Sequence, residues 1–265
     1  MIVPLDVRQA ATAAAPARSN LIAVASGKGG VGKTWFSISL AHTLALAGKK
    51  ALLFDGDLGL ANVDVQLGMT PRRDLGTFLA GQTTLGETAS RYAPGGFDVI
   101  AGRSGSGSLA QVAPSRLAAL RSDLQILATQ YDYVIMDMGA GIERTVRSFA
   151  TQAKFCFVVT TDEPTAITDA YAFIKVTTME RPNADMRLVV NMANSVREGE
   201  RTFAILQKAC REFLKVELEL GGIIRRDLHV RESIRKQTSL MTRYPNSEAA
   251  IDVQAIVARL QHAGP

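Results

Sequence analysis

The stretch SGKGGVGKT, residues 26–34, decides the fold because it contains a glycine-rich phosphate loop. Residues 27–34 match the pattern G-x-x-x-x-G-K-[S/T], in which backbone N–H groups and a lysine bind the phosphates of a nucleotide. The apolar run LIAVAS before this loop predicts a buried β-strand, and residues 34–47 after it predict a helix. A strand, a phosphate loop and a helix in this order indicate a nucleotide-binding α/β protein.

Short apolar runs and helical patterns alternate along the rest of the chain. The further runs that predict strands are 51–55, 97–102, 133–137, 155–160, 186–191 and 218–224. The further helical patterns are 115–129, 143–151, 165–179, 202–213 and 247–262. Because the strands are apolar on both faces, they predict one doubly wound, mostly parallel sheet with helices on both sides. We expect this α/β domain to cover residues 20–265, after a flexible tail of residues 1–19 that is rich in alanine and proline.

The composition excludes several classes of protein. The chain has 265 residues, 47% of them hydrophobic and 21% charged, which is typical of a globular protein. No apolar run approaches the roughly 18 residues that a membrane-spanning helix needs, and the first residues lack the apolar core of a secretory signal, so a cytoplasmic location is expected. Cys156 and Cys210 lack C-x-x-C spacing, so buried free thiols are expected and a redox metallocluster protein is excluded.

The phosphate loop predicts which groups hold a nucleotide, and we expect ATP with Mg²⁺. Lys33 is expected to reach the β and γ phosphate oxygens, and the Thr34 hydroxyl to ligate magnesium. Trp35 is unusual directly after the loop threonine, but its backbone N–H can still serve the α-phosphate. The other expected nucleotide-binding positions of the loop are Gly27, Lys28, Gly29, Gly30, Val31 and Gly32.

Three carboxylates follow predicted strands. Asp55 and Asp57 lie where the run 51–55 ends in a loop, and such a pair can serve magnesium and an attacking water. Asp137 ends the strand YVIMD and is followed by a glycine-bearing turn, the pattern of a Walker B strand and a mobile switch. Asp137 is therefore expected to hold magnesium through water, with Gly141 near the γ-phosphate. The glycine- and serine-rich patch 102–108 also follows a strand's carboxyl end, where open α/β sheets place ligands.

The loop KGGVGKT carries a second lysine, Lys28, and so resembles the deviant Walker A loop KGGxGK[S/T] of the MinD/ParA family of ATPases. The resemblance implies that Lys28 reaches the phosphates of a partner's nucleotide, so that hydrolysis depends on a homodimer. It implies catalytic roles for Lys28, Lys33 and Asp57, with Asp57 orienting the water and Asp55 in the magnesium shell. It also implies that Asn191, at the end of the strand MRLVVN, reads the adenine, and that Asp227 lies on the nucleobase side.

Three further segments, 57–69, 160–176 and 189–203, resemble the flagellar-number regulators called FlhG or FleN within this family. This resemblance implies a switch ATPase that controls flagellar number or placement. It implies an FlhF-type GTPase or flagellar components as partners, and peripheral contact with the inner membrane or cell pole. The C-terminal helical pattern has an apolar stripe that could either bind a membrane or pack in the core, namely Ala250, Val253, Ile256, Val257 and Leu260.

Two other functions remain open at this point. A ParA-type positioning ATPase would bind DNA nonspecifically as an ATP dimer, through a basic run that could also be a solvated helix face: Arg225, Arg226, Arg231, Arg235 and Lys236. The net charge of +5 is too small to decide between these interpretations. A nucleotide-gated scaffold, in which ATP sets the oligomeric state and turnover is incidental, is the second alternative.

Overall fold

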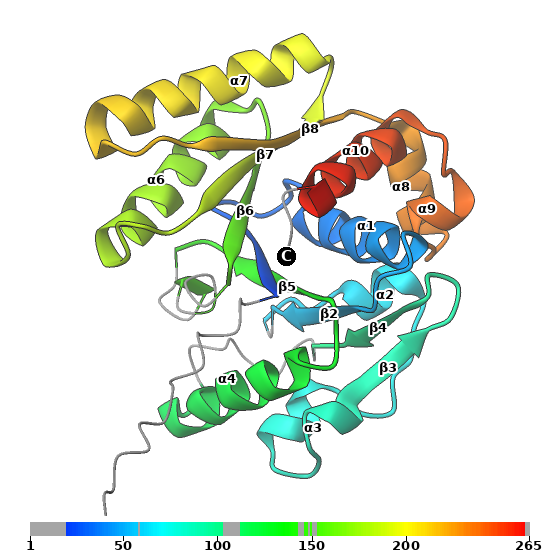
Figure 1. Ribbon diagram of the computed structural model, residues 1–265. Helices are drawn as coiled ribbons and strands as arrows, with labels where there is room; N and C mark the ends of the chain where they lie inside the picture. Colours follow the sequence, from blue (N-terminus) through cyan, green and yellow to red (C-terminus); the bar gives the residue numbers. More distant parts are fainter. Residues whose placement is uncertain are drawn as a thin grey trace, which may run out of the picture.

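The computed structural model describes residues 20–57, 59–102, 112–142, 146, 147, 149 and 153–262 (Figure 1). The predicted tail 1–19, the glycine- and serine-rich patch beyond Gly102 and most of the predicted helix 143–151 lie outside these residues.

One eight-stranded sheet forms the centre of the described chain, with the strand order β3-β4-β2-β5-β1-β6-β7-β8. All neighbouring strands are parallel except β3 and β4, which form an antiparallel hairpin. The strands are β1 (Leu21–Ser26), β2 (Ala51–Gly56), β3 (Ala89–Tyr92), β4 (Phe97–Ile100), β5 (Tyr133–Ala140), β6 (Phe155–Thr160), β7 (Met186–Ala193) and β8 (Glu219–Arg225). Because β1 lies between β5 and β6, the phosphate loop after β1 emerges where the winding of the sheet reverses, the usual ligand position in such folds.

Helices cover both faces of the sheet because the strand residues alternate between two apolar clusters (Figure 1). In β1, Ile22 and Val24 face one cluster while Leu21 and Ala23 face the other. The first cluster contains residues of α1 (Lys33–Leu46), α2 (Val63–Leu67), α8 (Leu228–Arg235), α9 (Leu240–Arg243) and α10 (Glu248–His262). The second contains residues of α3 (Leu75–Leu79), α4 (Pro114–Ala128), α6 (Pro164–Glu180) and α7 (Val196–Ala209). The predicted fold class is therefore confirmed.

All seven predicted strands occur, but one strand and several short elements were not predicted. The edge strand β3 has the sequence ASRY, which lacks an apolar run, and the 3₁₀ turn Gly86–Thr88 precedes it. Helix α7 begins six residues before the predicted start, since the Ser195 side chain accepts a hydrogen bond from the Glu198 N–H and caps it. Helix α7 continues as a π-helical turn over Cys210–Leu214, which ends at Lys215 with a φ of 59°.

The C-terminal helix α10 packs into the core. All five residues of its predicted apolar stripe are buried, against α1 and β8. Arg225 at the end of β8 forms two ion pairs with α10. Its Nη2 lies 2.9 Å from Asp252 Oδ1 and its Nη1 lies 2.7 Å from Glu248 Oε1. Core packing is thus the role that the structure gives this stripe. None of the helices in the described part of the chain is long and apolar enough to cross a bilayer.

A buried histidine makes the stability of the fold depend on pH. His42 in α1 is 2% exposed, and its Nδ1 lies 2.7 Å from Ser239 Oγ. Burial lowers the pKa of His42 to about 4, whereas an unfolded chain has a histidine pKa of about 6.5. The unfolded state therefore binds more protons between these values. The stabilisation is complete above about pH 6.5 and is lost as the pH falls towards 4.

We expect the free energy of unfolding to fall by about 2 kcal/mol between pH 7 and pH 5 through His42. Urea unfolding at both pH values measures this loss. The His42→Asn variant, which keeps a polar atom near Ser239, should show a clearly smaller pH dependence. An equal loss in the wild type and the variant would show that other groups cause it.

Candidate functional site

A cavity of about 330 Å³ lies at the carboxyl edge of the sheet, between the phosphate loop and the segment that follows β2. Asn62, Gln66, Met192 and Ile234 complete its wall. Eight of the predicted site residues line it: Lys28, Gly29, Gly30, Gly32, Lys33, Thr34, Trp35 and Asp57. Most of the Trp35 ring lies in the apolar cluster around α1, so that only 5% of the residue is exposed.

The phosphate loop has an open side and a packed side. Gly30 and Gly32 have φ values of 82° and 86°, a left-handed backbone that glycine adopts readily. A Cβ at Gly29 or Gly30 would meet no atom within 4 Å, so these positions are open to a ligand. A Cβ at Gly32 would lie 2.3 Å from Nδ2 of Asn191, which donates a hydrogen bond to the Val31 carbonyl at 2.8 Å. Asn191 therefore supports the packed side of the loop.

Gly27 is needed for a different reason from the other loop glycines. A Cβ at this position would lie 2.1 Å from the carbonyl oxygen of Asp169, which belongs to the backbone of α6. Real Cβ atoms essentially never come this close to another heavy atom. Gly27 thus allows α6 to pack directly against the start of the phosphate loop.

Lys33 and Asp137 form a buried ion pair beside the cavity. Lys33 Nζ lies 3.1 Å from Asp137 Oδ1, and their side chains are 8% and 1% exposed. Ser37 Oγ donates a hydrogen bond to the same oxygen at 2.9 Å. The other oxygen, Asp137 Oδ2, is buried and accepts no hydrogen bond from the described residues. An unpartnered buried carboxylate oxygen is unfavourable unless water or a cation satisfies it.

Asp55 lies next to Asp137 in the register of β2 and β5. Burial and the negative charge of Asp137 raise the pKa of Asp55 to about 7. Asp55 Oδ1 accepts the Asp57 N–H at 3.1 Å, and Oδ2 accepts the Asn62 and Val63 N–H groups at 3.2 Å. Asp55 therefore holds the loop after β2 in place. Two neighbouring buried carboxylates favour a cation, so the residues fit a magnesium ion held by Thr34 and Asp137.

Asp57 lies between the cavity and the end of β5. Its Oδ1 accepts the Leu60 N–H at 3.0 Å, and its carboxyl carbon lies 3.6 Å from the position of a Cβ on Gly139. Gly141, with a φ of 104°, donates its N–H to the Ser26 carbonyl at 2.9 Å. The end of β5 thus contacts the start of the phosphate loop, although Ala140 rather than Gly141 lines the cavity.

Lys28 is held by the start of α6 in the same chain. Its Nζ donates hydrogen bonds to Glu163 Oε2 at 2.9 Å and to Thr165 Oγ1 at 2.8 Å. The Lys28 side chain is 37% exposed, so it lies at the rim of the cavity. Glu163 and Thr165 were not predicted as functional residues. Pro164, which lies between them, is typical of the first turn of a helix, so the sequence could have indicated that a helix begins here but not that it contacts Lys28.

Comparison with known proteins assigns the family. A family model described as the CobQ/CobB/MinD/ParA nucleotide binding domain matches residues 22–240. The chain belongs to this family. It is 39% identical over 240 residues to the antiactivator FleN of Pseudomonas aeruginosa, covering 91% of this chain and 85% of FleN. It is 32% identical to the flagellum site-determining protein YlxH of Helicobacter pylori, covering 91% of this chain and 82% of YlxH.

Solved structures of MinD show the same fold. The cell division ATPase MinD of Pyrococcus furiosus has a TM-score of 0.78 and 21% identity, covering 93% of this chain and all of that one. MinD of Pyrococcus horikoshii, solved with Mg-ADP, has a TM-score of 0.77 and 22% identity, covering 92% and 97% of the two chains. The predicted doubly wound fold of the MinD/ParA type and the predicted resemblance to FlhG and FleN are thus confirmed.

Two roles expected of this nucleotide-binding family are not visible in the described contacts. Asp227 caps α8 by accepting the His229 N–H at 2.9 Å, and its second oxygen accepts the Ala249 N–H at 3.2 Å. It joins α8 to α10 and does not line the cavity. Asn191 bonds to the Val31 carbonyl and, through Oδ1, to the Met192 N–H at 2.9 Å. Nucleobase contacts by Asp227 and Asn191 therefore remain predictions.

Proposed function

We propose that this protein is an ATP-dependent dimerising ATPase that controls the number or placement of flagella. The observation that carries the proposal is the 39% identity to the antiactivator FleN over 91% of this chain. The match to YlxH, whose name also refers to the flagellum, supports the same reading. The match to a nucleotide binding domain confirms the prediction of a nucleotide ligand, and the phosphate loop and carboxylates support ATP with Mg²⁺.

The arrangement of charged groups supports hydrolysis of ATP to ADP and phosphate. Lys33 and the open N–H groups of the loop would bind and orient the phosphates. Asp57 would orient the water that attacks the γ-phosphorus in line with the leaving ADP oxygen. Thr34 and Asp137 would hold magnesium, which supplies positive charge to the phosphate oxygens.

The position of Lys28 supports dependence on a dimer. The carboxylate of Glu163 and the hydroxyl of Thr165 hold its ammonium group within the same chain. A lysine held in this way is directed to the outer rim, where a second subunit would approach. On dimerisation it would exchange these partners for phosphate oxygens of the neighbouring nucleotide and stabilise charge during phosphoryl transfer. Turnover by the monomer would then be slow.

Several finer features belong to this proposal. An FlhF-type GTPase or a flagellar component would be the partner, and the protein would act in the cytoplasm, with peripheral contact at the inner membrane or cell pole. Since the α10 stripe is buried, such contact would use other surface residues. A DNA-binding role is not favoured, because Arg225 in the basic run is already paired with Glu248 and Asp252.

Size measurement by light scattering tests the switch. We expect a monomer in Mg-ADP and a dimer in a nonhydrolysable ATP analogue. With ATP, the Asp57→Ala variant should stay dimeric without releasing phosphate, because it keeps every residue that holds the nucleotide. Lys33→Ala, which loses the loop lysine, is the control and should remain monomeric. A wild type that is monomeric with the analogue, at a concentration where binding is complete, would contradict the switch.

A cell experiment tests the flagellar role separately. Deletion of the gene in the source organism should change the number or position of flagella, counted by electron microscopy. The wild-type gene should restore the original pattern, and the Lys33→Ala gene should not. An unchanged pattern after deletion would contradict the flagellar role. It would not contradict ATP-dependent dimerisation, which the size measurement tests.

A further inference from the structure

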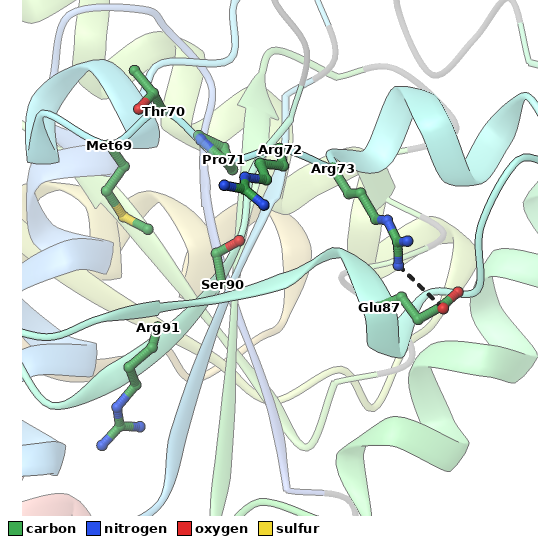
Figure 2. A pocket seen from close by; sticks show the side chains of 8 residues that line it. All are labelled: Met69, Thr70, Pro71, Arg72, Arg73, Glu87, Ser90 and Arg91. Atoms are coloured by element: carbon green, nitrogen blue, oxygen red, sulfur yellow. Dashed lines mark ion pairs between the residues drawn. The ribbon is translucent and has the colours of Figure 1, made fainter.

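A second and larger hollow, of about 570 Å³, lies beside the edge strand β3 (Figure 2). Its walls come from the segment Met69–Arg73, which follows α2, and from Glu87, Ser90 and Arg91. None of the residues that line the nucleotide cavity takes part in it. The established family and the proposed ATPase activity therefore leave this hollow without a role.

Positive charge dominates the hollow, since three arginines face one glutamate. Arg73 Nη1 lies 3.1 Å from Glu87 Oε1, and Arg91 Nη1 lies 3.0 Å from Asp98 Oδ1 on β4. Hydrogen bonds from Thr84 and Thr83 lower the pKa of Glu87 to about 2, so it stays ionised and orients Arg73.

Arg72 differs from the other two arginines. Its side chain is exposed and has no hydrogen bond or ion pair with any residue that the structure describes. Figure 2 shows its guanidinium group above Ser90, on the side of the hollow opposite Arg91. A guanidinium group without a partner can bind a carboxylate through two parallel hydrogen bonds.

The backbone beside these arginines is a free sheet edge. Strand β3 is the first in the strand order and pairs only with β4 among the described strands. Ser90 and Arg91 are successive residues of β3 that point to opposite faces of the strand, and both line the hollow, so the hollow borders this edge strand. Unpaired N–H and C=O groups of an edge strand accept an extended peptide as an additional strand.

We propose that this hollow binds an extended acidic segment of a partner protein, which adds a strand to β3 and places carboxylates against Arg72, Arg73 and Arg91. The backbone pairing would provide affinity, and the arginines would select acidic side chains at alternate positions. The site lies outside the nucleotide cavity, so nucleotide and peptide can bind together.

Fluorescence anisotropy tests the site with a fluorescein-labelled decapeptide of alternating glutamate and valine, added to the full chain in Mg-ADP. We expect Arg72→Glu to weaken binding at least about tenfold, because it reverses the unpaired charge. Arg197→Glu is the matched control, since Arg197 is exposed on α7, far from β3 in the strand order, and the charge change is the same. It should change binding less than about twofold. Equal losses in the two variants would overturn the proposal.

Two further peptides test how the segment binds. Methylating the backbone nitrogens of one valine and the adjacent glutamate keeps the charge and removes one N–H from each edge of the peptide. This blocks backbone pairing whichever edge faces β3, and the methylated peptide should bind at least about tenfold more weakly. A lysine-for-glutamate peptide should not bind. Equal binding of the methylated peptide would indicate a simple anion site and overturn the proposal. Binding to phosphatidylglycerol vesicles without any binding of the acidic peptide would also overturn it. Should Arg72→Glu lower the melting temperature, Arg72→Ala provides the same comparison.

Discussion

Replacing Lys28 by alanine should lower ATP turnover by about a thousandfold, the effect of removing a charge supplied in trans to phosphoryl transfer. Nucleotide affinity in the monomer should change little, because the ammonium group of Lys28 is bound to Glu163 and Thr165. Phosphate release at saturating protein and ATP measures turnover, and a fluorescent ADP analogue measures affinity. Wild-type turnover in Lys28→Ala would contradict the proposed role.

Mixing two inactive variants shows whether Lys28 acts on its own subunit or on its partner. In a dimer of Lys28→Ala with Asp57→Ala, one site keeps Asp57 and receives Lys28 from the other subunit. Random mixing of equal amounts should therefore restore about a quarter of the wild-type turnover, since half of the dimers each carry one complete site. A lysine that acts within its own chain would restore none.

The variant Thr165→Val is a control for the same prediction. It removes one of the two groups that hold Lys28 in the monomer but leaves the lysine itself in place. Its turnover at saturating protein should stay near the wild-type value. A loss as large as that of Lys28→Ala would mean that the contact with α6, rather than transfer to a partner, is what catalysis requires.

Replacing Gly27 by alanine should destabilise the fold by about 3–5 kcal/mol, near the upper end of single-residue effects. The new Cβ would lie 2.1 Å from the Asp169 carbonyl oxygen and 2.2 Å from its carbon, and both atoms belong to the backbone of α6. Because no flexible side chain can move aside, the helix or the phosphate loop must shift. Urea unfolding without nucleotide measures the loss.

Gly29→Ala is the matched control for this prediction. It is the same substitution two residues along the loop, where a Cβ would meet no atom within 4 Å. Its free energy of unfolding should lie within about 1 kcal/mol of the wild type. Equal stability of the Gly27 and Gly29 variants would contradict the proposed contact between α6 and the loop.

The sequence predicted the parts of the fold and site whose signal is local. The parallel strands were recognisable because each is an uninterrupted apolar run between helical patterns. Strand β3 was missed because its four residues are mostly polar and gain their position from pairing with β4. Lys33, Asp57 and Asp137 could be predicted because each lies at a fixed place relative to a strand end.

The remaining site contacts depend on tertiary structure. Lys28 and Glu163 are 135 residues apart in the chain, and nothing local to either residue indicates that they meet. The same holds for Gly27 and Asp169, and for Asn191, whose contact with the phosphate loop spans 160 residues. Asp227 accepts hydrogen bonds from the first turns of both α8 and α10, and this contact depends on where α10 packs in the folded chain.

Helix α10 lies against both β8 and α1, and α1 begins at Lys33, the lysine of the phosphate loop. The final helix is thus a mechanical support for the nucleotide pocket, although it lies more than two hundred residues from the loop in the chain. A shortened protein made to remove a suspected membrane anchor would also leave one side of α1 exposed to water. Lost localisation in such a protein would then reflect a damaged pocket rather than a missing anchor.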